Sequence, residues 1–149
     1  MGLYLLDTNA FTALYDGRKA ERAPRFHTTV RERISLDGEL VIPTFVLYEA
    51  RRGLEELKLR SEGAKKIARF ERLLQSATIL GLDANNGWLV AAKLWAWNKA
   101  KGTNIQEGDL LVVATASLHK RKLVTADQPL IEAMRALGLD RILDAHLLE

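Results

Sequence analysis

Short apolar runs alternate along the chain with longer segments whose apolar residues recur at helical spacing. The run at 3–6 is followed at once by the polar residues Asp7, Thr8 and Asn9, which is typical of a buried strand leading into a helix. Similar apolar runs recur later in the chain. We therefore predict strands at 3–6, 40–42, 78–80, 123–126 and, at an edge, 141–143.

Helices are predicted between these strands. The run 110–116 is apolar enough for a buried strand or a buried helix, and we choose a helix because it extends to Lys120 and places Asp109 in its first turn or at its cap. The polar segment 16–24 contains Gly17 and Pro24 and is predicted to be an exposed loop. Helices are expected at 10–14, 28–35, 44–57, 62–75, 86–101, 109–120 and 128–137.

Alternation of strands and helices favours an α/β fold with a mostly parallel sheet of about five strands, covered by helices on both faces. No internal repeat, low-complexity tract or long linker interrupts the chain. Residues 1–149 are therefore predicted to form a single domain.

The predicted helix at 86–101 carries an unusually wide apolar surface. Large and small apolar residues occupy positions i, i+3, i+4 and i+7, and further residues widen the stripe. We expect this helix to be buried on more than one side, either in the core or in a subunit interface. The residues are Trp88, Ala91, Ala92, Trp95, Leu94 and Trp97.

The amino-acid composition excludes several classes of protein and of site. The chain has no cysteine, which excludes disulfides, zinc–thiolate sites and thiol catalysis. No apolar run approaches the roughly 18 residues of a membrane span, and the start lacks the pattern of a signal peptide, so we predict a cytoplasmic protein without a membrane partner. The formal net charge of +3 is only a weak sign of nucleic-acid binding.

Four acidic residues lie where this fold would gather them. Asp7 and Asp127 end predicted strands, Glu49 lies in the second turn of the helix after another, and Asp109 begins the helix that leads into the fourth. In a parallel sheet these positions lie toward one rim, where the carboxylates would repel one another and raise one another's pKa. A divalent cation removes that conflict, and oxygen ligands favour Mg²⁺ or Mn²⁺, which can activate water for phosphodiester hydrolysis.

Each acid also has a simpler explanation. Asp7, Asp109 and Asp127 all stand where helices begin, so helix capping accounts for each of them alone, and Glu49 could be a solvated helix residue. Thr8 and Asn9 can orient a carboxylate or a metal-bound water, although capping explains each of those separately as well.

Four segments, in this order, resemble the acidic motifs of PIN-domain ribonucleases, and the chain is similar to the VapC-type toxins of toxin–antitoxin pairs. The order and spacing of these segments span nearly the whole chain. They are 5–9, 44–54, 108–116 and 123–127.

The resemblance implies a three-layer α/β/α fold and a Mg²⁺- or Mn²⁺-dependent endoribonuclease that leaves 5′-phosphate and 3′-hydroxyl ends. It also implies a homodimer and a cognate antitoxin whose tail covers the active-site groove. The RNA target could be tRNA, rRNA or mRNA. By position, the metal-binding acids would be Asp7, Glu49, Asp109 and Asp127, with Asn9 and Thr125 as supporting polar residues.

The chain departs from the family pattern in two places. Leu130 stands where the family often has Phe, which would alter packing, and the segment 18–33 is long and basic, so the substrate groove could differ. Candidates for contacts with RNA phosphates are Arg51, Arg52, Lys120, Arg121 and Lys122.

Two other functions compete with the nuclease. A haloacid-dehalogenase-like phosphatase also begins with a strand that ends in Asp, but it needs a second Asp where this chain has Asn9. A PIN-like module that binds RNA or protein without cleavage is the other alternative. The presence of all four acids argues against that module.

Overall fold

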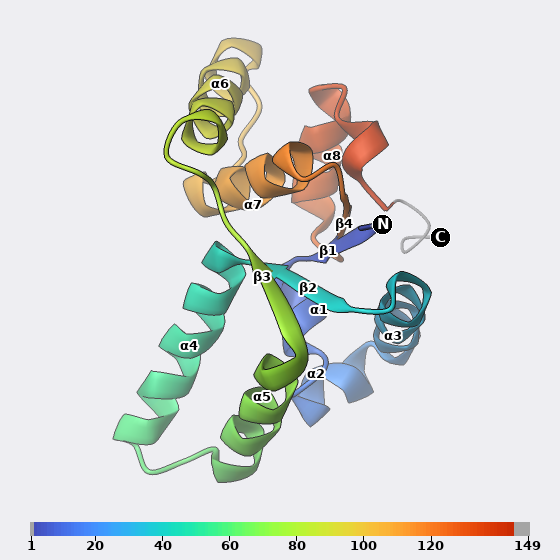
Figure 1. The fold of residues 1–149 in the computed structure, drawn as a ribbon, viewed down its shortest axis with the longest axis vertical. Helices are drawn as coiled ribbons and strands as arrows, with labels where there is room; N and C mark the ends of the chain where they lie inside the picture. The colour runs from blue at the N-terminus through green and yellow to red at the C-terminus, as the bar shows by residue number, and fades with distance from the viewer. Residues whose placement is uncertain (1, 145–149) are drawn as a thin grey trace.

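The computed structural model describes residues 2–144, and Figure 1 shows their path. The elements follow one another in the predicted alternation of strands and helices. They are β1 (Tyr4–Leu6), α1 (Thr8–Thr12), α2 (Gly17–Arg22), α3 (Pro24–Asp37), β2 (Leu40–Pro43), α4 (Thr44–Leu59), α5 (Ala64–Ser76), β3 (Ala77–Leu80), α6 (Asn86–Lys101), α7 (Glu107–Leu118), β4 (Lys122–Val124), α8 (Gln128–Ala136) and the 3-10 helix η1 (Asp140–Ile142).

The strands are short and all of their pairings are parallel. β1 pairs with β4, placing Tyr4 opposite Lys122, and β2 pairs with β3. β1 also lies beside β2, so that the two pairs form one layer in the order β3, β2, β1, β4. Figure 1 shows helices on both sides of this layer, with α6, α7 and α8 on one side and α1 to α5 on the other. The predicted α/β class with a parallel sheet is confirmed.

The last predicted strand, at 141–143, is largely wrong. The 3-10 helix η1 covers Asp140–Ile142, and only Leu143 forms a parallel bridge, to Leu123. This bridge places Leu143 beside β4 at the edge of the layer.

The core lies between the strands and the helices that cover them. Leu5, Leu6, Ile42 and Leu123 of the strands are buried, as the apolar runs predicted. The helix predicted over the run 110–116 is confirmed as α7, which is buried around most of its circumference. That burial explains why the segment is apolar without a clear polar face.

Helix α2 occupies the segment that was predicted to be a loop, so that prediction is wrong. The Asp16 carboxylate accepts a hydrogen bond from Arg18 N and caps the helix. The same carboxylate pairs with Lys66 of α5 at 3.0 Å, an interaction between residues that are distant in sequence. Helix α3 is also longer than the predicted 28–35, because Pro24 fits its first turn.

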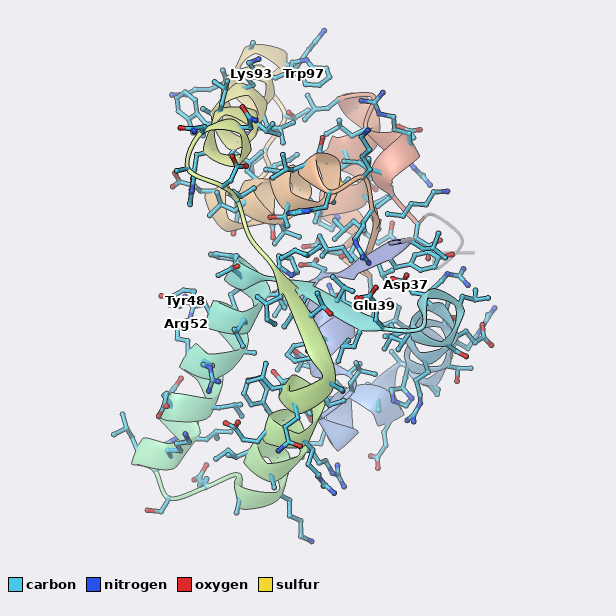
Figure 2. The ribbon with its side chains drawn as sticks, in the orientation of Figure 1. Asp37, Glu39, Tyr48, Arg52, Lys93 and Trp97 are labelled. Atoms are coloured by element: carbon cyan, nitrogen blue, oxygen red, sulfur yellow. The ribbon has the colours of Figure 1, made fainter. Side chains whose placement is uncertain are left out.

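Helix α6 is far more exposed than its composition suggested. Trp88 is 52% exposed, Trp95 47% and Trp97 40%, whereas only the side that carries Ala91 and Leu94 is buried. Figure 2 shows Trp97 and Lys93 projecting outward from this helix. Burial on more than one side is therefore wrong within a single chain. No helix in residues 2–144 combines the length and apolar character needed to cross a membrane.

Candidate active site

The parallel pairing of β1 and β4 brings Asp7 and Asp127 to the same edge of the sheet. Asp7 directly follows β1, and its backbone N donates to the carbonyl of Val124 at the end of β4. Each carboxylate also caps a helix, because Asp7 accepts from Thr8 N and Asp127 accepts from Leu130 N. Both aspartates therefore fulfil the capping role that their positions predicted, and capping alone does not exclude a second role.

Glu49 and Asp109 reach this edge from two helices. Glu49 of α4 accepts a hydrogen bond of 2.5 Å from the Thr8 hydroxyl, next in sequence to Asp7. Asp109 lies in the first turn of α7. A side chain at Gly108 would come within 2.4 Å of the Phe45 ring of α4, so glycine allows the start of α7 to approach α4 this closely.

The four carboxylates lie close enough to influence one another's ionisation. Burial, together with the negative charges of Asp7, Asp127 and Glu49, raises the pKa of Asp109 to about 6. Burial also raises the pKa of Asp7, against the opposing effect of hydrogen bonds from Thr125 and Thr8. The structure thus brings together all four acids that the sequence singled out.

The predicted supporting residues connect the ends of the two strands. Thr125 is fully buried, and its hydroxyl donates to Asp7 Oδ2 at 2.7 Å while it accepts from Asp127 N at 3.1 Å. Asn9 Oδ1 accepts from Ala126 N at 3.2 Å, and Asn9 Nδ2 donates to the Thr125 hydroxyl at 3.4 Å. These bonds fix the Asp7 carboxylate relative to the segment that carries Asp127.

The oxygen donors suit a hard divalent cation, but they do not already surround a single position. Within residues 2–144 no three acidic or histidine side chains converge as they would around a metal ion. Glu49 Oε2 instead lies 3.8 Å from Arg52. Binding of Mg²⁺ or Mn²⁺ would therefore require these carboxylates to turn toward one another.

The basic residues predicted to contact RNA separate into different environments. Arg52 pairs with Glu49 and lies over the Tyr48 ring, and both side chains project from the same side of α4 in Figure 2. Arg51 pairs with Glu71 of α5 at 3.5 Å. Lys122 lies opposite Tyr4 at the amino end of β4, and Lys120 precedes that strand by two residues, so both belong to the edge of the sheet that is opposite the four acids.

Arg121 is not available to RNA, which corrects its predicted role. Its side chain is buried, and it donates to the carbonyl of Tyr4 and to Asp37 Oδ2, both at 2.9 Å. It also lies 3.6 Å from Glu39. The sequence could not reveal this pairing, because the acidic partners are distant along the chain.

A groove of about 370 Å³ opens beside Glu49. Its lining includes basic residues that the site prediction did not contain. These residues are Lys19, Arg60 and Lys66. For Lys66 the sequence signal is the basic face of the helix predicted at 62–75, which also carries Lys65, Arg69 and Arg72.

Comparison with known proteins agrees with the fold. The sequence matches the family model of the PIN domain over residues 4–135. Curated protein sequences give no significant match.

Two solved structures are similar to this chain. One is VapBC2 from Rickettsia felis bound to a DNA fragment from their promoter, with 18% identity, a TM-score of 0.68 and coverage of 95% of this chain and 96% of that chain. The other is FitAcB from Neisseria gonorrhoeae, with 25% identity, a TM-score of 0.66 and coverage of 89% and 94%.

Proposed function

Because the chain belongs to the PIN domain family, we propose that it is a metal-dependent endoribonuclease that hydrolyses RNA phosphodiester bonds. The observation that carries the proposal is the meeting of four carboxylates from separate parts of the fold. Burial and the charges of the other three acids raise the pKa of Asp109 to about 6. Such a cluster destabilises the metal-free protein, and a bound divalent cation would relieve the repulsion.

In this proposal Asp7, Glu49, Asp109 and Asp127 hold the cation, either Mg²⁺ or Mn²⁺. When bound, the ion supplies a polarised phosphodiester oxygen and an activated water. The Thr125 hydroxyl keeps the Asp7 carboxylate in one orientation through its 2.7 Å hydrogen bond, and Thr8 does the same for Glu49. Asn9 supports the site by holding Ala126, which precedes Asp127.

We further propose that the chain is the toxin of a type II toxin–antitoxin pair and is inhibited by its cognate antitoxin. The likeness to chains of VapBC2 and FitAcB over most of the molecule supports this assignment. The exposed aromatic residues of α6 support a homodimer, since such a surface is unusual on a monomer. Light scattering of the purified chain, alone and with the antitoxin, measures both assemblies.

The decisive experiment is cleavage of a mixed pool of tRNA and other structured RNA. Wild-type protein is assayed with Mg²⁺ or Mn²⁺ and with EDTA, beside an Asp7→Asn variant whose thermal stability matches that of the wild type. We expect cutting that requires the metal and that the variant loses, and the fragments will identify the substrate. If wild type and variant bind the ion and are equally inert, the nuclease proposal is wrong and the chain is a PIN-like binding module.

A further inference from the structure

A long hollow leads away from the acidic edge of the sheet. The groove beside Glu49 shares the lining residues Tyr15, Leu57 and Lys66 with a second hollow of about 920 Å³. The second hollow lies where α2 approaches the start of α5. The two hollows adjoin at these residues, and we call them together the α2–α5 groove.

Contacts between α2 and α5 hold the walls of this groove in place. Lys66 of α5 pairs with Asp16, the residue that caps α2, at 3.0 Å. The Arg69 side chain of α5 rests against the start of α2, because a side chain added at Gly17 would lie 3.5 Å from Arg69 Nη1. The groove is therefore a feature of packed helices and does not depend on the course of a loop.

Basic residues outnumber acidic ones along the groove, whose acidic lining residues are Asp16, Glu21, Glu49 and Glu62. Arg52, Arg60 and Lys66 each lie near an acidic residue and are at least partly neutralised. Four other cations of the lining are exposed and form no ion pair within residues 2–144. They are Arg18 and Lys19 of α2 and Lys65 and Arg69 of α5.

Cations on two facing helices repel one another unless an anion lies between them. Lys65 and Arg69 are four residues apart on α5, about 6 Å along the helix axis, so they can contact different phosphates of one strand. A single-stranded nucleic acid fits such a channel, since repeated backbone charges follow a positively charged groove without regard to sequence. The groove also begins at Glu49, where the scissile phosphate would lie if the proposed function is correct.

We propose that RNA on one side of the scissile phosphate runs along the α2–α5 groove and is held by Arg18, Lys19, Lys65 and Arg69. This inference rests on the proposed nuclease function and adds to it a direction for the substrate. It also assigns substrate binding to α2, the helix that the sequence did not predict.

The test uses RNAs that contain one cleavage site and are extended stepwise on either side of it. We expect kcat/KM of the wild type to rise with extension on one side until the groove is filled, and to stay level with extension on the other. In a Lys65→Gln/Arg69→Gln variant this rise should be lost. Glutamine keeps the helix propensity of the two residues while removing both charges.

The matched control is a Lys93→Gln/Lys101→Gln variant, which removes the same charge from α6, at the other end of the molecule in Figure 1. Salt dependence gives a second readout. Each lost phosphate contact reduces the slope of log affinity against log salt by about 0.7, so raising salt from roughly 50 to 200 mM should weaken the wild type about sevenfold more than the groove variant.

The outcomes separate this inference from the function on which it rests. If the wild type cuts no RNA, the nuclease proposal fails. If it cuts RNA but the groove and control variants have the same length and salt dependence, the proposed path is wrong. If the groove variant cuts RNAs of all lengths like the control but resists the antitoxin, the groove binds an acidic protein segment and the inference is overturned.

Discussion

The acidic residues at the two edges of the sheet have different partners. At the amino ends of the strands, Asp37 and Glu39 share the guanidinium of Arg121, and Asp37 also accepts hydrogen bonds from the backbone of Leu3 and Tyr4. Figure 2 shows Asp37 and Glu39 together at this edge. At the carboxyl ends, the Asp7 side chain accepts hydrogen bonds from Thr8 and Thr125 alone among residues 2–144, and the nearby charges of Glu49 and Asp127 help to raise its pKa.

This difference predicts that the acids of the first edge serve the fold and that, under the proposed function, those of the second edge hold a ligand. A buried carboxylate with a cation and several donors lies in a satisfied environment, and removal of one partner is strongly destabilising. Carboxylates that face one another oppose folding instead, and Arg52, 3.8 Å from Glu49, offsets their repulsion only in part. The paired edge should therefore control stability, and the unpaired edge should control activity.

The largest predicted effect is the loss of activity in an Asp127→Asn variant. Asparagine caps a helix about as well as aspartate, so the start of α8 should be preserved and stability should change by no more than about 0.5 kcal/mol. The missing ligand charge should lower kcat/KM about a thousandfold, since a catalytic metal supplies several kcal/mol. Cleavage rates and urea denaturation of the same preparation measure both effects.

This substitution separates capping from metal binding at one position. An active variant would show that Asp127 only caps α8. An Asp127→Ala variant, which removes cap and charge together, should be both inactive and less stable, by about 1 kcal/mol.

At the paired edge, a substitution should lower stability and leave activity unchanged. Substitution of Arg121 by Met leaves Asp37 and Glu39 without their shared cation and should lower the free energy of unfolding by about 3 kcal/mol. The fraction that remains folded should cleave RNA at the wild-type rate. Urea denaturation checks the first expectation, with the neighbouring exposed Lys122→Gln as control. An unchanged midpoint for Arg121→Met would mean that the ion pairs contribute nothing net.

Much of the fold could be predicted because burial leaves a local signature. The apolar runs around Leu5 and Leu123 marked central strands, and the Ala- and Leu-rich run of α7 marked a helix enclosed by other elements. The acids at strand ends could also be selected, because parallel strands end at the same edge. Their actual proximity could not be predicted, since strand order and the glycine contact between α7 and Phe45 are tertiary features.

The wrong predictions from sequence have a common cause, which is that they depend on contacts between residues distant in the chain. The segment of α2 has turn-forming residues, but Asp16 joins Lys66 across 50 positions of sequence. Arg121 lies in a basic run that is typical of a surface, but its partner Asp37 lies 84 positions away in the sequence. Composition likewise could not separate a core helix from the partly exposed α6, because both are rich in large apolar residues.

A smaller effect is expected from the hydroxyl that orients Asp7. In a Thr125→Val variant the side chain keeps its shape, while Asp7 Oδ2 loses its 2.7 Å hydrogen bond and Asp127 N loses its acceptor. We expect kcat/KM to fall about 10- to 100-fold, as is usual when a residue behind a metal ligand is removed. Thr125→Ser should retain most of the activity. Equal rates for Val and Ser would show that the hydroxyl has no role in catalysis.

The smallest predicted effect is a gain in stability at the unpaired edge. The pKa of Asp109 is raised from 3.8 to about 6 in the folded protein, so the folded state binds the proton more tightly than the unfolded state does. The folded protein therefore loses stability as the pH rises from about 4 to 6, and the loss is complete above pH 6. Below the unfolded pKa the carboxyl is neutral in both states and imposes no penalty.

An Asp109→Asn variant removes this penalty. In EDTA at pH 7.5 it should be more stable than the wild type by on the order of 1 kcal/mol, after allowance for solvent screening, with a Tm about 3 °C higher. The gain should vanish near pH 4, and Mn²⁺ should raise the Tm of the wild type more than that of the variant. Thermal unfolding of both proteins at the two pH values gives the comparison. A lower Tm for the variant at pH 7.5 would mean that the interaction of Asp109 with the amino end of α7 outweighs the repulsion among the four carboxylates, and the contrast between the two edges of the sheet would then fail at this residue.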